Sequence, residues 1–502
     1  MGIVQKESVK LTVVIYLGSA LGYLNKVLLL TNFLTATQVG LINILPSVAV
    51  LYAQFATLGI PSISNRFFPF FHNKEKRHHG FFFWGNVFVF AGFLLSTILF
   101  ILFKPAIAGW YAKNSPMIVD YYYYLILLAL ASVYFQFFES YLRSLLKTVV
   151  PTFLNEVFSK ILVTICISLF ALKWIDFHQL IIIYIGCNFL NTAILLVYII
   201  YLKQFFFKPE KSKMYNRLLK PILLYGSFTI LSVLGSGILV NIDSLMIASK
   251  LDLAQAGIYT TIFLIATGLT VPYRSIQKIT YPLVGRFWKN RDMKAVSDLY
   301  DKTTLVMMII GGGLILLLFG NIDSIFRFIP AEYSVARYSF YLLCIAKYVD
   351  MVAGLNGIIT ITSKKYKYDL YFMLVLVILT IILNLVFIPL YGITGAALAA
   401  MISLVVYNLL RLIFVWVNFK MQPFTLNCFW ILLITIGTWG IVHFMPYLHN
   451  KYISLCLNSA VIGILYFGSI LLFKFSPDIN NMAYKFTGLK FLKMDKEKSM
   501  FE

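Results

Sequence analysis

The sequence predicts an all-α polytopic membrane protein with about fourteen transmembrane helices. Hydrophobic residues make up 60% of the 502 residues and charged residues only 12%, with a mean hydropathy of +0.84. This composition excludes a soluble globule. The apolar runs are continuous and long enough to cross roughly 30 Å of hydrocarbon as helices. A membrane barrel is excluded, because its strands would read as stretches of about ten residues with alternating hydrophobicity.

The apolar runs are interrupted most strongly between residues 203 and 220. The first run follows only Lys6 and Lys10 and has no small-residue cleavage site, so we interpret it as a retained signal anchor. Prolines Pro46 and Pro61 fall in the second run. Helices are expected, within about two to four residues, at 10–34, 38–68, 80–103, 117–147, 150–172, 179–202, 221–249, 255–280, 303–320, 332–360, 367–389, 392–418, 425–446 and 452–473.

An internal repeat indicates how these helices are grouped, since transporters are often built from repeats. A shift of 217 residues overlays the first helical hairpin on the seventh and eighth spans. Equal residues then coincide at Leu28/Leu245, Leu34/Leu251, Gln38/Gln255, Gly40/Gly257 and Ala49/Ala266. The predicted domains are an N-terminal six-helix lobe (1–202), a cytoplasmic linker (203–220), a second six-helix lobe (221–418), two additional transmembrane helices (419–475) and a cytoplasmic tail (476–502).

The loops alternate in charge, and this pattern predicts the orientation. About 32 of the 42 Lys and Arg residues fall in one set of loops, and Lys and Arg are retained in the cytoplasm. Both termini are therefore expected in the cytoplasm, and the repeat is parallel. The net charge of +22 does not indicate nucleic-acid binding, because the basic residues sit at helix ends.

Two ionisable residues lie deep in predicted spans, where charge is costly and usually functional. Lys26 lies in the first span and Asp243 in the seventh, and the 217-residue shift places them at equivalent positions. They could pair across a central cleft, or each could serve a separate ligand. Asn25 and Asn241 flank them and add hydrogen-bonding capacity.

Three further acid–base combinations have helical spacing: Lys347/Asp350, Glu139/Arg143 and Glu156/Lys160. Each is either a structural pair that neutralises itself for insertion or part of a substrate and ion pathway. Excess positive charge occurs only toward the expected cytoplasmic mouth. This candidate vestibule, which could capture a phosphate-bearing headgroup, contains Arg66, Arg274, Lys278 and Arg411. Ordinary positive-inside anchoring explains each of the four equally well when taken singly.

Motifs for catalysis are absent from the sequence. It contains no G-x-x-x-x-G-K-[ST], H-E-x-x-H or G-x-S-x-G pattern. The five cysteines show no metal-site spacing, and His78-His79 has no acidic partner nearby. We therefore expect that the chain does not hydrolyse nucleotide itself and has no catalytic residue, metal or bound cofactor. If Asp243 were released from Lys26, its carboxylate could take up Na⁺ or H⁺ as a coupling ion.

Two stretches resemble polysaccharide flippases. The first is Asn241-Ile-Asp243-Ser-Leu-Met-Ile with Ala256-Gly-Ile-Tyr259. The second combines Asn384 with Pro389-Leu-Tyr-Gly392-Ile-Thr-Gly395. On these motifs the chain is identified as a member of the multidrug/oligosaccharidyl-lipid/polysaccharide exporter superfamily, in its O-antigen and capsule flippase branch. The resemblance implies a fold of two six-helix lobes and two further helices. Drug exporters of the same superfamily typically have twelve helices, so the two extra spans argue against that class.

The resemblance also implies an activity. Such a protein would move undecaprenyl-diphosphate-linked oligosaccharide repeat units across the bacterial cytoplasmic (inner) membrane, by ion-coupled alternating access, for O-antigen and lipopolysaccharide synthesis. Membrane lipids and polysaccharide polymerase machinery would be its other partners. Lipid II flippases place several arginines in the cavity, whereas this chain has Lys26, Lys160 and Lys347 with acids nearby. Two alternatives stay open: a cation-coupled multidrug exporter and a non-transporting membrane partner of the envelope-glycan machinery.

Overall fold

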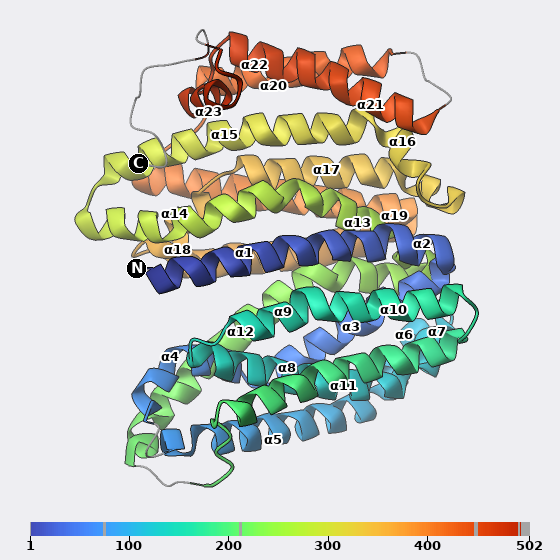
Figure 1. The fold of residues 1–502 in the computed structure, drawn as a ribbon, viewed down its shortest axis with the longest axis vertical. Helices are drawn as coiled ribbons and strands as arrows, with labels where there is room; N and C mark the ends of the chain where they lie inside the picture. Colours follow the sequence, from blue (N-terminus) through green and yellow to red (C-terminus); the bar gives the residue numbers. More distant parts are fainter. Residues whose placement is uncertain (1, 74–76, 210–212, 446–449, 490–491, 493–502) are drawn as a thin grey trace. The chain divides into compact units, whose positions relative to one another are not determined.

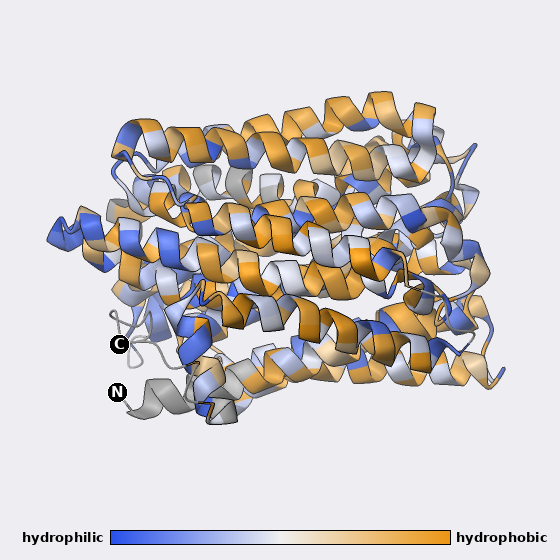
Figure 2. Cartoon of the chain, turned by 90° about the horizontal axis from the view of Figure 1, so that it is seen from above, coloured by the Kyte–Doolittle hydropathy of each residue, from blue (hydrophilic) through white to orange (hydrophobic). Residues whose placement is uncertain are grey.

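The protein is helical throughout the part of the chain that the structure describes (Figure 1). A computed structural model describes residues 2–73, 77–209, 213–445, 450–489 and 492. Hydrophobic residues fill the middle of the individual helices, and hydrophilic residues gather toward their ends (Figure 2). Helices suit lipid because every backbone donor and acceptor is satisfied within the same segment. The predicted fold class, an all-α polytopic membrane protein, is confirmed.

The chain forms two compact units, residues 1–261 and residues 262–502. In the first unit α8 packs against α3, α4, α5 and α11, and α10 packs against α11 (Figure 1). The elements that lie in or begin in this unit are α1 (Gly2–Tyr23), η1 (Leu24–Leu29), α2 (Leu30–Phe33), α3 (Ala36–Ala56), α4 (Ile60–Phe71), η2 (Arg77–Gly80), α5 (Phe81–Leu102), α6 (Lys104–Tyr111), α7 (Pro116–Asp120), α8 (Tyr122–Ser144), α9 (Val149–Phe153), η3 (Leu154–Phe158), α10 (Ser159–Ala171), α11 (Phe177–Tyr201), α12 (Lys213–Lys250) and α13 (Leu253–Thr267).

In the second unit α17 packs along α19, and α15 packs against α14, α17 and α20. A buried cluster that includes Ile309, Ile431 and Tyr466 joins α15 to the last helices. The elements here are η4 (Gly268–Thr270), α14 (Val271–Asn290), α15 (Met293–Gly320), α16 (Ile322–Phe326), η5 (Ala331–Ala336), α17 (Arg337–Val352), α18 (Asn356–Thr362), α19 (Lys367–Phe419), α20 (Leu426–His443), α21 (Lys451–Ile462), η6 (Gly463–Phe467), α22 (Gly468–Leu472) and α23 (Pro477–Thr487).

The number of spans agrees with the prediction. Within the described residues, twelve helices are long and apolar enough to cross a membrane. The helices Ala331–Val352 and Asn356–Thr362, bent by 49°, pass the same test together, as a broken span or a re-entrant loop. The 53 residues of α19 would extend about 80 Å, far more than one bilayer. Its backbone breaks at Gly392, where φ is 60° and ψ is −139°, so α19 supplies two spans. With α19 counted as two spans and the bent pair as one, these described helices match the expectation of about fourteen.

The 217-residue repeat is visible where α3 meets α13. A Cβ added to Gly40 would overlap the carbonyl oxygen of Leu253, and a Cβ added to Gly257 would overlap that of Ala36. Leu253 is the repeat equivalent of Ala36, so the two contacts are the same contact made in both directions. Because only glycine lacks a Cβ, these two positions allow the helices to touch backbone to backbone.

The helix starts on both sides of this crossing are also equivalent. Thr35 caps α3 and accepts a hydrogen bond from the backbone N–H of Gln38, whose side chain accepts from the Thr35 N–H in return. Asp252 occupies the corresponding position before α13 and accepts from the Gln255 N–H at 2.7 Å. This capping supplies acceptors for the first N–H groups of each helix. The structure thus shows the repeat to be real at these residues.

Two helices lie in segments that the sequence analysis treated as linker and tail. Helix α12 begins at Lys213, within the predicted linker, and contains Pro221. The predicted tail contains the amphipathic helix α23, whose mixed polar sequence gives no transmembrane signal. Residues 210–212 of the linker and 490–491 and 493–502 of the tail lie outside the described residues. The assignment of 1–202 and 221–418 as transporting lobes stays a prediction.

Candidate functional site

A close contact at the start of the chain organises the first group of predicted residues. Gly18 and Gly22 form a G-x-x-x-G pattern that lets α1 approach another helix closely in lipid. A Cβ on Gly18 would lie 2.7 Å from the carbonyl carbon of Glu156, and a Cβ on Gly22 would lie 3.4 Å from Lys160 Cε. This contact places the first span beside the Glu156/Lys160 pair.

Asn25 joins the same two helices. Its side chain is 2% exposed, donates to the Lys160 carbonyl oxygen at 2.7 Å and accepts from the Thr164 hydroxyl at 2.8 Å. Both polar groups of the amide are therefore satisfied by α10. Asn25, predicted as a pathway residue, is in this structure a fixed link between helices.

Lys26 follows in the π-helical segment η1, and Glu156 lies in the π-helical segment η3. Such segments occur frequently at functional sites because they break the regular hydrogen-bond ladder. Glu156 forms an ion pair with Lys160 at 2.7 Å. Lys26 is exposed, and no ion pair to it occurs among the described residues. The predicted Lys26–Asp243 pair is therefore not formed in this structure.

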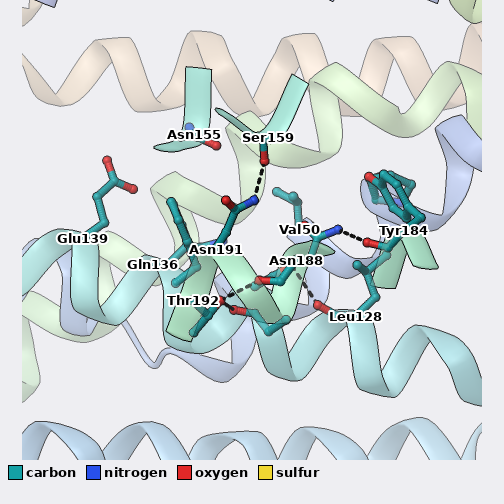
Figure 3. A pocket seen from close by; sticks show the side chains of 14 residues that line it. Val50, Leu128, Gln136, Glu139, Asn155, Ser159, Tyr184, Asn188, Asn191 and Thr192 are labelled. Carbon is teal, nitrogen blue, oxygen red and sulfur yellow. Dashed lines mark hydrogen bonds between the residues drawn. The ribbon is translucent and has the colours of Figure 1, made fainter. Parts of the chain in front are cut away.

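A polar pocket of about 230 Å³ lies inside the first unit (Figure 3). It is lined by α3, α8, α11 and the η3–α10 helix, and most of its polar lining consists of amides and hydroxyls. The polar residues of the lining are Ser132, Gln136, Glu139, Asn155, Ser159, Tyr184, Asn188, Asn191 and Thr192. Asn191 is 3% exposed and donates to the Ser159 hydroxyl at 2.7 Å, but its Oδ1 is buried with no hydrogen-bond partner.

Such a pocket can take water or a small hard cation, which prefers oxygen ligands. Glu139 supplies the one carboxylate in its lining. That carboxylate is paired with Arg143 at 2.5 Å, as the helical spacing predicted. The described residues contain no group of three or more His, Cys, Asp or Glu side chains arranged to hold a metal ion.

Asp243 is also satisfied locally. It is 7% exposed and accepts a 2.9 Å hydrogen bond from the Tyr259 hydroxyl, itself 2% exposed. The Asn241 side-chain amide donates to the Gly237 carbonyl oxygen at 2.9 Å within its own helix, so this N–H group is already used in a local hydrogen bond.

In the second unit, Lys347 and Asp350 take separate partners. The Lys347 ammonium lies 4.6 Å from the centroid of the Phe263 ring, a distance suited to a cation–π contact. Asp350 accepts a 3.1 Å hydrogen bond from Asn408 Nδ2. The two residues share a helix face but do not neutralise each other.

The four predicted vestibule residues have different environments. Arg66 is exposed, with its guanidinium carbon 4.4 Å from the Tyr225 ring centroid. Arg274 and Lys278 are exposed one turn apart on α14. Arg411 is largely buried, forms an ion pair with Asp369 and lies 4.2 Å from the Tyr407 ring. Arg411 is therefore a neutralised, structural cation, whereas the other three are accessible to an anion.

The sequence interpretation missed Tyr259, Asn408 and Asp369, the partners of Asp243, Asp350 and Arg411. These partners lie 16, 58 and 42 residues away along the chain, so no helical spacing marks them. The Gly18–Gly22 pattern was a usable signal for the contact of α1 with η3.

Comparison with known proteins identifies relatives over most of the chain. The sequence model of the family described as "Polysaccharide biosynthesis protein" matches residues 4–288. An uncharacterized membrane protein of Methanocaldococcus jannaschii is 22% identical over 492 residues, covering 93% of this chain and 94% of that protein.

Several solved structures share the fold. A structure of the lipid II flippase MurJ in an inward closed conformation has a TM-score of 0.70 at 16% identity, covering 92% of this chain and 98% of that one. An inward-facing multidrug resistance MATE family transporter of the MOP superfamily has a TM-score of 0.58 at 14% identity, covering 81% and 94%. A MATE transporter of Vibrio cholerae has a TM-score of 0.55 at 13% identity, covering 84% and 98%. With a family match over more than half of its length, the chain belongs to the family described as "Polysaccharide biosynthesis protein", and it has the fold that these transporter structures share.

Proposed function

We propose that the protein is a flippase that moves undecaprenyl-diphosphate-linked oligosaccharide repeat units across the bacterial cytoplasmic membrane. The observation that carries this proposal is Lys26. It is an accessible cation deep in the first span, without an acidic partner among the described residues. A charge in a span is by default part of a pathway, and a lipid diphosphate is its natural complement.

The same electrostatics count against the multidrug exporter. Export of cationic drugs requires an available carboxylate, but Glu139 is paired with Arg143 and Asp243 accepts from Tyr259. The accessible charges described above, Lys26 and the vestibule residues Arg66, Arg274 and Lys278, are instead positive. A polyanionic headgroup therefore suits this protein better than an organic cation.

We place the coupling ion, Na⁺ or H⁺, in the polar pocket of the first unit. Its lining holds the unpartnered Asn191 Oδ1 and further amide and hydroxyl oxygens, while the Glu139 carboxylate stays paired with Arg143. Collapsing the Na⁺ gradient and the proton gradient separately, in proteoliposomes that flip the substrate, identifies the ion. Transport that continues at the same rate without either gradient would contradict ion coupling.

Deletion of the protein in its native host tests the function. We expect undecaprenyl-diphosphate-linked oligosaccharide to accumulate on the cytoplasmic side of the membrane. Drug sensitivity with normal glycans would favour the exporter instead. Normal translocation, together with a failure of polymerisation, would favour a non-transporting partner of the polymerase machinery.

In the same strain, Lys26→Ala and Asp243→Ala are each expected to abolish complementation while membrane insertion is retained. Lys26→Ala removes the cation offered to the diphosphate, and Asp243→Ala leaves the buried Tyr259 hydroxyl without its acceptor. Lys26→Arg should retain transport. Lys104→Ala is the control: that partly exposed lysine follows α5, donates to the Tyr123 hydroxyl at 3.0 Å and lies 4.2 Å from the Tyr123 ring centroid. Wild-type glycan export by both alanine variants would show that neither residue belongs to the pathway.

The proposed topology has both termini in the cytoplasm. Single cysteines at Thr35 and Trp174 should then react with an impermeant thiol reagent in cells whose outer membrane is permeabilised. Cysteines at Lys147 and Arg291, in turns that follow α8 and α14, should stay unlabelled until the inner membrane is opened. Labelling of Lys147→Cys from outside would contradict the proposed orientation.

A further inference from the structure

An apolar groove of about 290 Å³ lies on the first unit, separate from the polar pocket. Its walls come from the α3–α4 turn and α4, from the start of α5, and from the first half of α12. Ile63, Phe81, Trp84, Phe88 and Leu219 are among the lining residues, whose only polar side-chain groups are the Trp84 indole and the Ser227 hydroxyl.

The groove owes part of its width to missing side chains. Gly85 and Gly226 belong to its lining, and a Cβ on Gly226 would already lie 3.0 Å from Ile63 Cδ1. Along α12 the lining runs from Leu219 to Ile230, a rise of about 16 Å in an α-helix. The groove is therefore about as long as one leaflet of the roughly 30 Å hydrocarbon core is thick.

One end of the groove carries positive charge. Arg66 lies one helical turn beyond Ile63, and its guanidinium stacks on Tyr225, the residue before Gly226. It is exposed, and no carboxylate bonds to it among the described residues. Lys220, beside Leu219, is exposed as well. Stacking holds the guanidinium over the ring and leaves its planar fork of N–H donors free for a phosphate.

We propose that this groove binds the isoprenoid chain of a polyprenyl diphosphate carrier lipid, with the diphosphate at Arg66. This inference rests on the proposed function and adds a carrier-lipid site outside the polar pocket. Arg66 lies in α4, toward the end of the span that is expected on the cytoplasmic side, so the lipid would be held from the inner leaflet, where the substrate is loaded.

Three observations favour this carrier over an ordinary phospholipid. A single groove of this size accommodates one chain, whereas a phospholipid brings two. Arg66 offers a planar fork of N–H donors with no carboxylate partner among the described residues, which suits a diphosphate, the more negatively charged headgroup. All lining residues fall between 58 and 230, inside the part of the chain that matches the polysaccharide biosynthesis family.

Photo-crosslinking tests the site in the full-length protein, purified into phosphatidylcholine nanodiscs. The probe is a benzophenone-bearing polyprenyl diphosphate without sugar, and labelled peptides are mapped by mass spectrometry. We expect labels on α5 and on residues 219–230 of α12. Unlabelled polyprenyl diphosphate should compete with the probe, and phosphatidylglycerol should not.

Two variants and their matched controls sharpen the result. Ser227→Trp fills the groove from its exposed side. Arg66→Gln removes the guanidinium that would donate hydrogen bonds to the diphosphate. Each variant should lower labelling about tenfold. Arg66→Lys should retain part of it. Leu224→Trp, on the same helix but outside the lining and 60% exposed, and Lys147→Gln should label like the wild type.

Equal competition by phosphatidylglycerol would show an ordinary lipid site and overturn the proposal, as would the absence of labelling in the groove. A flipping assay on the same preparation separates this failure from failure of the function. Flipping without groove labelling rejects only the carrier site. Groove labelling by the competed probe without flipping supports the site and rejects the flippase.

Discussion

Replacing Gly40 with leucine is expected to prevent the protein from reaching its folded state. A side chain at this position would enter space already filled by the Leu253 carbonyl oxygen, a backbone atom that cannot rotate away. Overpacking of a core typically costs about 1–3 kcal/mol and occasionally more, and here α3 and α13 would have to separate. Melting of the purified protein in detergent measures the effect, and we expect little folded protein to be recovered.

The repeat supplies a second version of the same experiment. Gly257→Leu should fail as Gly40→Leu does, because its Cβ would overlap the Ala36 carbonyl oxygen and lie 2.7 Å from the Gly40 nitrogen. Gly186→Leu is the control, because no atom lies within 4 Å of a Cβ added there. A Gly40→Leu protein with an unchanged melting temperature would show that the crossing is not a close backbone contact.

Arg411→Ala is expected to cause the second largest loss of stability. Arg411 and Asp369 lie in different arms of α19, and their side chains are only 16% and 19% exposed. Removing one partner of a buried pair leaves the other charge without compensation, at a cost of about 3–5 kcal/mol where it cannot rehydrate. Arg411→Lys keeps the charge but not the planar fork, so its loss should be smaller. Thermal melting of both variants gives the comparison.

Two controls distinguish this pair from ordinary surface charge. Arg337→Ala removes a pair with Asp323 whose side chains are 46% and 47% exposed, and exposed pairs contribute about 0–1 kcal/mol. The double variant Arg411→Met/Asp369→Leu should melt near the wild type, because an apolar pair of similar volume carries no buried charge. A melting temperature of Arg411→Ala equal to that of Arg337→Ala would contradict the structural role of the pair.

The transmembrane architecture could be predicted because lipid imposes a simple rule on the sequence. Each crossing needs a continuous apolar helix, and Pro389 with Gly392 marked the break inside α19. Pairs within one helix, such as Glu139/Arg143, were predictable because their spacing along the helix fixes the distance between the two side chains. The shared glycines Gly40 and Gly257 likewise marked a repeat that the structure bears out.

The partners of the polar side chains could not be predicted from spacing. Whether Asp350 meets Lys347 or Asn408 depends on how α17 and α19 are rotated against each other, which hydrophobic periodicity does not encode in a helix that is apolar on all sides. The π-helical segment at Lys26 also has no compositional signature, because it changes the hydrogen-bond register without changing residue types. Helix α23 was missed because its amphipathic sequence is too polar to resemble a span.

The crossing of α3 and α13 has the form of an isologous dimer interface, in which one surface patch meets a copy of itself about a two-fold axis. Gly40 faces Gly257, and Asn43 donates to Thr260 at 3.2 Å, again a residue and its own repeat equivalent. In a homodimer of single repeats, any substitution on the axis would alter both faces at once. Fusion into one chain removes that coupling, and the Asn43–Thr260 pair shows the result: one copy supplies the donor and the other the acceptor, so the two halves are free to specialise.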